Sequence, residues 1–457
     1  MQTSPRLISM YLPQYHQTPE NDRWWGEGFT EWARVRAGTP RFHGHYQPHV
    51  PGQLGYYDLR DAKVRSAQAE LAREHGIHGF CYYHYWFNGR RLLELPFEEV
   101  LKTGEPDFPF CLCWANENWT RRWDGQSQKV LIEQKYSDED SLNFIRSLIP
   151  AFQDRRYIRV DGRPLLLVYR TGLLPNPGKV AEIWRKAMKE EGVGDLYLVR
   201  IENFMHGPEP APGDVGFDAA MEFAPYWGFV GRRLERAEVD LPTDIRAYSY
   251  DDCMKAMLNR PLPSYKLFRG IFTGWDNSPR RNNGPTIFID SSPEKYAYWL
   301  SLILKQTVNM FEGDDRIVFI NAWNEWGEGC HLEPDEKYGL RYLRATRMVF
   351  RQSEDYALLI DKIRHLRDAD EGALQTWLEN LDRVYSSGDR LTEKEAILLR
   401  AFGNLTNPPK MMVLDSELND QVDQLLRGKD AIIQSIFDSL SWKITAPLRK
   451  LYDKFFT

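Results

Sequence analysis

Short apolar runs alternate with longer segments rich in charged residues through residue 350. This alternation is typical of repeated βα units that build a parallel sheet. Segments with a helical pattern cover Asp61–His75, Lys179–Glu191 and Pro293–Met310. Eight apolar runs are the candidate strands, and they are Arg6–Tyr11, Gly79–Tyr83, Phe108–Trp114, Leu165–Tyr169, Leu196–Ile201, Ala219–Phe223, Phe268–Phe272 and Ile317–Ala322.

Eight parallel strands with long crossovers are what a closed barrel requires. We therefore predict an α/β fold, a (β/α)8 TIM-type barrel over residues 1–350. The alternative is an open doubly wound sheet. The first strand is not followed by the Gly-rich turn G-x-G-x-x-G that would favour that alternative.

The chain changes character after residue 350, where aromatic residues become sparse and charged, helix-like segments follow. We predict a helical C-terminal extension over residues 351–457. Its last part, Asp415–Phe456, reads as one or two amphipathic helices and mixes basic with bulky apolar residues. That pattern suits a membrane surface or a partner helix, and it equally suits a helix packed back on the barrel.

Polar and aromatic residues cluster just after the apolar runs. In TIM-type barrels the loops at the carboxyl ends of the strands build the active site, so these residues are candidates for binding a substrate. The candidates are Tyr15, His16, Trp25, His84, Tyr85, Trp86, Trp114, Asn116, Glu117, Trp119, Glu222, Trp275, Asp276, Trp323, Asn324 and Trp326.

Glu325 and Glu328 follow the eighth run and are the candidate catalytic residues. A tight turn brings side chains three residues apart to within about 5–6 Å. Two close carboxyls suit glycosidic chemistry, in which one donates a proton and the other stays charged. The alternative is an ordinary loop with two solvated Glu residues. Glu117 binds sugar hydroxyls in this reading, or it forms a structural ion pair with Arg121 or Arg122.

The composition favours a carbohydrate ligand. The chain holds 15 Trp, 23 Tyr and 23 Phe, many of them beside polar residues. Sugars present flat C–H faces that pack on aromatic rings, although a large aromatic core would also account for the numbers. The net charge of −6 gives no sign of a nucleic-acid partner.

The remaining residue patterns predict neither a cofactor nor a metal. His43, His45 and His49 lie in one loop-like run, but their spacing matches no standard metal motif. The five Cys residues form no disulfide framework, and the start of the chain lacks an apolar signal segment. We therefore expect a reduced, cytoplasmic setting, with the C-terminal helix as the point of any contact with the inner membrane or a partner protein.

Several longer runs resemble the WbsX-like proteins, which are grouped with glycoside hydrolase family 99 and often occur with O-antigen or other surface-polysaccharide genes. The resemblance covers roughly residues 5–350. The runs that carry it are Tyr11–His16, Asn21–Gly26, Phe29–Trp32, His45–Pro48, Cys81–Phe87, Trp114–Trp119, Asn321–Gly329 and Leu332–Asp335.

The resemblance implies a metal-independent barrel enzyme that retains anomeric configuration. Family 99 enzymes are endo-acting α-mannosidases, and their Asn-Glu-Trp-His-Glu-Gly motif resembles Asn324–Gly329. By that match Glu325 is the base that draws the proton from the sugar 2-hydroxyl, giving a 1,2-anhydro intermediate, and Glu328 is the general acid and then the base. The chain departs from the motif at Gly327, where the family has His.

Three functions follow from these observations. The first is a retaining glycoside hydrolase or transglycosylase that acts on a bacterial surface polysaccharide or its precursor. The second is a glycosyltransferase of O-antigen or surface-polysaccharide synthesis, a label commonly given to WbsX-like proteins. The third, which the intact acid pair disfavours, is a glycan-binding protein without turnover.

Overall fold

The computed structural model describes residues 4–121, 126–202, 210–235, 242, 244–281, 283–369 and 376–377. The chain divides into two compact units. One contains residues 6–299 and 317–347, and the other contains residues 1–5, 300–316 and 348–457. The candidate site lies wholly in the first of them.

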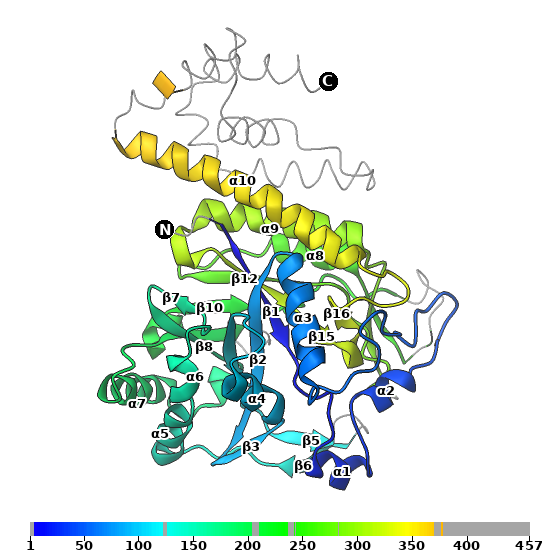
Figure 1. Ribbon diagram of the computed structural model, residues 1–457. Helices are drawn as coiled ribbons and strands as arrows, with labels where there is room; N and C mark the ends of the chain where they lie inside the picture. Colours follow the sequence, from blue (N-terminus) through cyan, green and yellow to red (C-terminus); the bar gives the residue numbers. More distant parts are fainter. Residues whose placement is uncertain are drawn as a thin grey trace, which may run out of the picture. The chain divides into compact units, whose positions relative to one another are not determined.

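The first unit is a closed barrel of eight parallel strands (Figure 1). Strand β1 pairs with β14 on one side and with β2 on the other, which closes the sheet on itself. All eight predicted strands are confirmed. They are β1 (Arg6–Tyr11), β2 (Ile77–Phe87), β4 (Phe110–Trp114), β8 (Arg163–Val168), β9 (Tyr197–Glu202), β10 (Ala219–Glu222), β12 (Leu267–Phe272) and β14 (Ile317–Asn321).

The barrel strands are mostly apolar because both of their faces are covered. Every residue of β1, β9 and β12 is buried. Helices pack on the outside while side chains fill the inside, so the strands show no regular alternation of apolar and polar residues, and most of the few charged residues that they carry are buried. The connecting helices are α3 (Ala62–Glu74), α4 (Leu95–Thr103), α5 (Asp138–Ser147), α6 (Ile149–Gln153), α7 (Pro177–Glu190), α8 (Tyr250–Leu258) and α9 (Pro293–Met310).

The starts of α3 and α5 are capped by polar side chains. Asp61 accepts a hydrogen bond from the backbone N–H of Lys63 at the start of α3, at 2.8 Å. Ser137 does the same for Asp140 at the start of α5, at 3.0 Å. These side chains satisfy backbone donors that the first helical turn leaves without a partner.

Short helices, turns and strands lie in the loops of the barrel. They include the helices α1 (Pro19–Trp25) and α2 (Trp32–Arg36), the 3-10 turns η2 (Thr171–Leu173) and η3 (Pro212–Val215), and the strands β3 (Arg90–Leu92), β5 (Trp119–Arg121), β6 (Gln126–Ile132), β7 (Arg159–Val160), β11 (Arg246–Ser249) and β13 (Thr286–Ile289). The loop after β14 forms the hairpin of β15 (Asn324–Glu325) and β16 (Cys330–His331), joined by the 3-10 turn η5 (Trp326–Glu328). This hairpin carries both candidate catalytic residues.

The second unit contains the turn η4 (Gly313–Asp315) and much of the long helix α10 (Arg341–Ala369). Val308, Tyr356, Ala357 and Ile360 form an apolar cluster in it. The boundary predicted at residue 350 falls within α10, so one helix runs through it. The predicted amphipathic segment, residues 415–456, lies outside the described residues.

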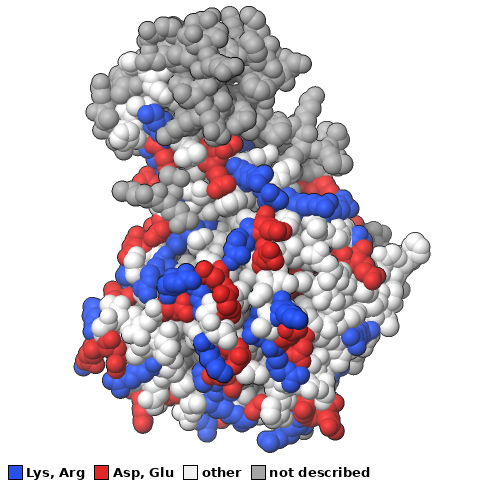
Figure 2. Space-filling view, viewed as in Figure 1, with Lys and Arg blue, Asp and Glu red and all other residues white. Residues whose placement is uncertain are grey.

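The surface of the barrel carries charges of both signs. On the face shown in Figure 2, Lys and Arg side chains are interspersed with Asp and Glu. Among the described residues, no helix is both long and apolar enough to cross a membrane. All five cysteines are buried free thiols.

Candidate active site

A pocket of about 770 Å³ opens in the barrel unit, and the ends of several strands contribute to its wall. Aromatic rings supply much of the lining, which suits the flat faces of sugar rings. The aromatic lining residues are Trp25, Tyr83, Tyr85, Trp119, Tyr136, Tyr169, Phe223, Trp227 and Trp275.

Glu325 and Glu328 lie together on this wall. Glu325 ends β15, and η5 then carries the chain through Glu328 to Gly329. Gly329 has a φ of +61°, a left-handed conformation that costs glycine little and other residues more. The turn therefore brings two acidic side chains, three residues apart, to one side of the pocket.

Arg280 lies between the two carboxylates. Its Nη2 is 2.7 Å from Oε1 of Glu325, and its Nη1 is 3.3 Å from Oε1 of Glu328. Its Nε donates a hydrogen bond to Oε1 of Glu31 at 2.6 Å. We call Glu31, Arg280, Glu325 and Glu328 the pocket cluster. One guanidinium serves three carboxylates there, so the cluster has an excess of acid.

Burial and, to a smaller extent, this excess of acid determine the proton affinity of the pair. Burial raises the pKa of Glu325 to about 8, against the opposing attraction of Arg280 and with help from the negative charges of Glu328 and Glu31. Burial also raises the pKa of Glu328, again opposed by Arg280. Two close buried carboxyls resist losing both protons. The pair can therefore hold a proton near neutral pH and offer both a donor and an acceptor.

Gly327 makes room for this arrangement. A Cβ atom built there would lie 2.2 Å from Oε1 of Glu31 and 2.6 Å from Nε of Arg280. Any larger residue at this position would collide with the ion pair unless the pair moved. The departure from the family motif is thus matched by an Arg–Glu pair in the same space.

The rest of the hairpin is tied to the barrel by side chains. Oδ1 of Asn324 accepts from the N–H of Leu12 at 2.7 Å, and Nδ2 of Asn324 donates to the Leu12 carbonyl at 3.0 Å. Nε1 of Trp326 donates to Glu333 at 2.6 Å, and its backbone N–H donates to the hydroxyl of Tyr15 at 3.1 Å. These bonds fix the residues directly before and directly after Glu325 in the chain, and so they fix the position of Glu325.

The predicted substrate-binding residues divide into two groups. The structure places one group in the lining of the pocket, namely Trp25, Tyr85, Glu117, Trp119 and Trp275. The second group is buried elsewhere and does not line the pocket. It consists of Tyr15, His16, His84, Trp86, Trp114, Asn116, Glu222, Asp276, Trp323, Asn324 and Trp326.

Strand alternation explains part of this division. Successive side chains of β2 point to opposite faces, so Tyr83 and Tyr85 line the pocket whereas His84 and Trp86 do not. Both of the latter rings contact Phe144 of α5, with centroids 6.0 and 5.8 Å away. The polar-aromatic pattern of the sequence does not say which face each residue takes.

Several other residues of the second group have structural partners. Trp114 stacks on Phe144, Trp323 is fully buried, and His16 is buried with its pKa lowered to about 4 by loss of solvation. Asn116 accepts from the backbone N–H of Arg170 at 2.8 Å. Asp276 lies 2.7 Å from Nε2 of His45.

Glu117 lines the pocket and pairs with Arg170, which also lines it. The pairing differs from the structural alternative considered from the sequence, because Arg170 lies on another strand end. The side chains of Arg121 and Arg122 lie outside the described part of the chain.

Glu222 belongs to a second buried charge network. It accepts from Nε of Arg269 at 2.7 Å and from Nη1 of Arg260 at 3.1 Å. Arg260 also pairs with Glu202, to which Nη2 of Arg200 donates at 2.9 Å. We call these five residues the strand cluster. None of them lines the pocket.

Sequence reasoning missed Glu31 and Arg280 as site residues. Glu31 lies in one of the runs that carry the family resemblance, so that run was a usable signal. Arg280 is 45 residues from Glu325 in the chain and lies in no recognisable motif (325 − 280 = 45). Its role depends on a contact that only folding creates.

Known proteins resemble this chain over the barrel. A sequence model of the family described as "Glycosyltransferase WbsX" matches residues 7–346. The protein WxcX of Xanthomonas campestris pv. campestris (strain B100), described as uncharacterized, is 44% identical over 354 residues. The match covers 77% of this chain and 50% of WxcX, so the chain spans about half the length of this relative.

Solved structures are similar to this chain as well. A glycoside hydrolase-like protein superposes with a TM-score of 0.50 at 14% identity, covering 76% of this chain and 94% of its own. A GH99 endo-α-mannosidase from Bacteroides thetaiotaomicron has a TM-score of 0.47 at 14% identity, covering 76% of this chain and 98% of its own.

Proposed function

Because the chain belongs to the WbsX family of carbohydrate-active enzymes, we propose that it is a retaining glycoside hydrolase or transglycosylase acting on a bacterial surface polysaccharide or its precursor. The observation that carries the proposal is the Glu325–Glu328 pair sharing Arg280 on the wall of an aromatic pocket. A glycosidic bond needs a proton donor for its leaving oxygen, and the pair supplies one.

The proposed roles follow the family motif. The carboxylate of Glu325 takes the proton from the sugar 2-hydroxyl while O2 forms a bond to C1. The bond from C1 to the leaving oxygen breaks, and Glu328 protonates that oxygen. In the second step water attacks C1 and gives its proton to Glu328, while O2 leaves C1 and recovers its proton from Glu325. The raised pKa of Glu325 makes its carboxylate a stronger base than an exposed one.

A glycosyltransferase is the second candidate, and two observations favour it. The family carries that description, and the pocket lining includes Arg170, Arg246, Arg280 and Arg281. Guanidinium groups bind phosphates well, and a nucleotide-sugar donor brings a diphosphate. Three of these arginines lie close to carboxylates of the pocket, which partly neutralise their positive charge. A diphosphate would therefore be bound less strongly, and the glycosyltransferase is the second candidate.

One experiment separates the two activities. The purified full-length chain is incubated with candidate bacterial surface polysaccharides, and in parallel with nucleotide sugars and an oligosaccharide acceptor. Release of new reducing ends, or redistribution of chain lengths, is the expected result. Nucleotide release that requires the acceptor, with no cleavage of any polysaccharide, would overturn the hydrolase proposal in favour of the transferase.

A further inference from the structure

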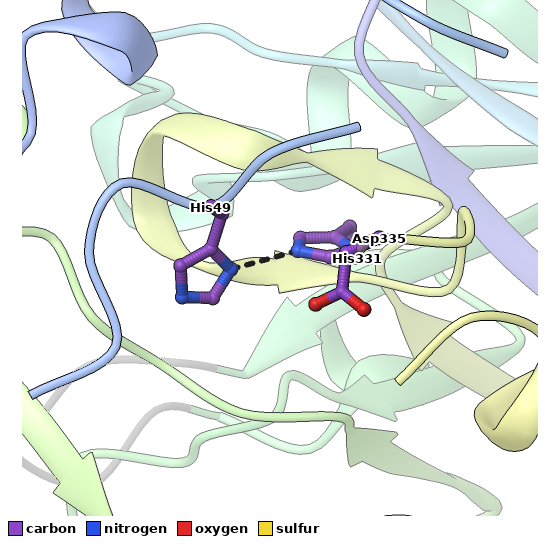
Figure 3. Close-up of side chains that lie close together, drawn as sticks. All are labelled: His49, His331 and Asp335. Carbon is purple, nitrogen blue, oxygen red and sulfur yellow. Dashed lines mark hydrogen bonds between the residues drawn. The ribbon is translucent and has the colours of Figure 1, made fainter. Parts of the chain in front are cut away.

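His49, His331 and Asp335 come together next to the catalytic hairpin but outside the pocket lining. One ligand-capable atom from each residue lies within 4.8 Å of the others. Figure 3 shows the ring of His49, from the loop before α3, facing the ring of His331, with the carboxylate of Asp335 beside them. We propose that these three residues form a binding site for one divalent transition-metal ion, such as zinc.

The ring geometry fits a metal. Nδ1 of His49 lies 2.9 Å from Nε2 of His331. Two ligand atoms held tetrahedrally about 2.0–2.1 Å from zinc would lie about 3.3 Å apart. An ion would therefore replace the hydrogen bond between the rings and separate the two nitrogens by a few tenths of an ångström. Asp335 supplies the third ligand, and a water molecule would complete four-coordination.

The groups around these ligands have the arrangement that metal sites use. Nδ1 of His331 lies 2.9 Å from the carbonyl of Glu333, to which it donates, so Nε2 presents a lone pair to the site. Asp335 accepts from the hydroxyl of Tyr46 at 3.0 Å and from the backbone N–H of Tyr338 at 2.6 Å. Such partners orient ligands and tune their basicity.

The ligand types select the class of ion. Two imidazoles with one carboxylate suit zinc and similar ions, whereas calcium and magnesium prefer oxygen ligands alone. Asp276 adds negative charge near His49, and Lys337 adds positive charge.

The ion would position the catalytic hairpin rather than touch a substrate. His331 ends β16, where it pairs with Asn324, and its ring stacks on Trp326 with centroids 3.7 Å apart. His49 packs directly against Gly329, because a Cβ atom built on Gly329 would lie 3.2 Å from Cε1 of His49. An ion shared by these elements would clamp the loop around His49 onto the turn that carries Glu325 and Glu328.

Metal binding by the full-length protein tests the site. The protein is treated with a chelator, dialysed and titrated with Zn²⁺ against a chromophoric competitor, and with Co²⁺ to record its visible absorption. We expect one ion per chain, a tetrahedral Co²⁺ spectrum and a thermal transition raised by zinc. His49→Gln should weaken binding by at least about tenfold, the lower end of what even an outer-shell change costs.

Two further variants keep the test decisive. His43→Gln removes an exposed histidine from the same loop and should bind as the wild type does. Asp335→Asn removes a ligand charge while leaving an oxygen for the Tyr338 N–H, and it should weaken binding even if His49→Gln folds poorly. Absence of stoichiometric uptake, or equal affinity in His49→Gln and His43→Gln, would overturn the proposal.

Discussion

The barrel contains two buried networks of Glu and Arg residues with opposite balances of charge. The pocket cluster has three carboxylates around Arg280, whereas the strand cluster has Glu202 and Glu222 among three arginines. Burial raises the pKa of Glu325 to about 8 in the first network. In the second, hydrogen bonds from Tyr265 and Arg260 outweigh burial and lower the pKa of Glu202.

The comparison shows that burial of a carboxyl does not by itself indicate catalysis. A buried acid with enough cations stays charged and serves as a structural element. A buried acid in a site with too few cations retains a proton and can exchange it. Of these two networks, the pocket cluster is the one that combines this second condition with access to a cavity.

The largest expected effect comes from removing either acid of the pocket cluster. Glu325→Gln and Glu328→Gln should each lower kcat/KM by about 10³-fold, because each loses a proton transfer. Circular dichroism should show an unchanged fold. Glu222→Gln, in the strand cluster, is the control and should keep nearly full activity per folded molecule. Wild-type rates in either pocket variant would remove that residue from the mechanism.

Removing the central arginine of each network should affect stability unequally. Arg280→Met leaves the buried carboxylates of Glu31 and Glu325 and the half-buried carboxylate of Glu328 without the guanidinium between them, and it should cost about 3–5 kcal/mol. Arg269→Met should cost less, about 1–3 kcal/mol, since Glu222 keeps Arg260. Urea unfolding of both variants measures the difference.

The cost of Arg280→Met should grow with pH. Without the guanidinium, the folded-state pKa values of the pocket carboxyls rise further above their unfolded values. The folded state then binds more protons than the unfolded state, so stability is present at low pH and is lost as pH rises through the folded pKa. An equal cost at about pH 5 and about pH 8 would contradict the charge imbalance.

Gly327→Ala should disturb the pocket cluster by crowding alone. The added methyl group would meet the Glu31–Arg280 pair, and overpacking of this kind costs about 1–3 kcal/mol. Gly213→Ala is the matched control, because nothing lies within 4 Å of a Cβ built there and its φ is not positive. Thermal denaturation of the two variants compares them. Equal melting temperatures would show that the space at Gly327 is not needed.

The smallest predicted effect is in the pH profile. The mechanism needs Glu325 unprotonated and Glu328 protonated in the same molecule, so kcat/KM should pass through a maximum and fall again at high pH, with one limb near the pKa of about 8. On either limb, well away from the maximum, each pH unit should change the rate about tenfold, because the fraction of enzyme in the required protonation state changes by that factor. Glu222→Gln should leave the midpoint in place. A rate that stays constant through pH 8 would contradict a role for Glu325 in proton transfer.

The sequence by itself determined the barrel and the place of the acids along it. Strands buried on both faces are mostly apolar, so β1, β4 and β14 are recognisable in the sequence as short apolar runs. Because the carboxyl ends of parallel strands meet at one end of a barrel, the sequence alone places Glu325 and Glu328 at that end.

The tertiary structure alone decided which partners surround those acids. Glu31 meets Arg280 across 249 positions of the chain, and His49 meets His331 across 282. It also decided that Tyr85 lines the pocket while Trp86 does not. The local sequence pattern indicates which residues can be buried. The charge around a carboxyl, however, depends on neighbours from distant segments of the chain, and these come together only when the barrel closes.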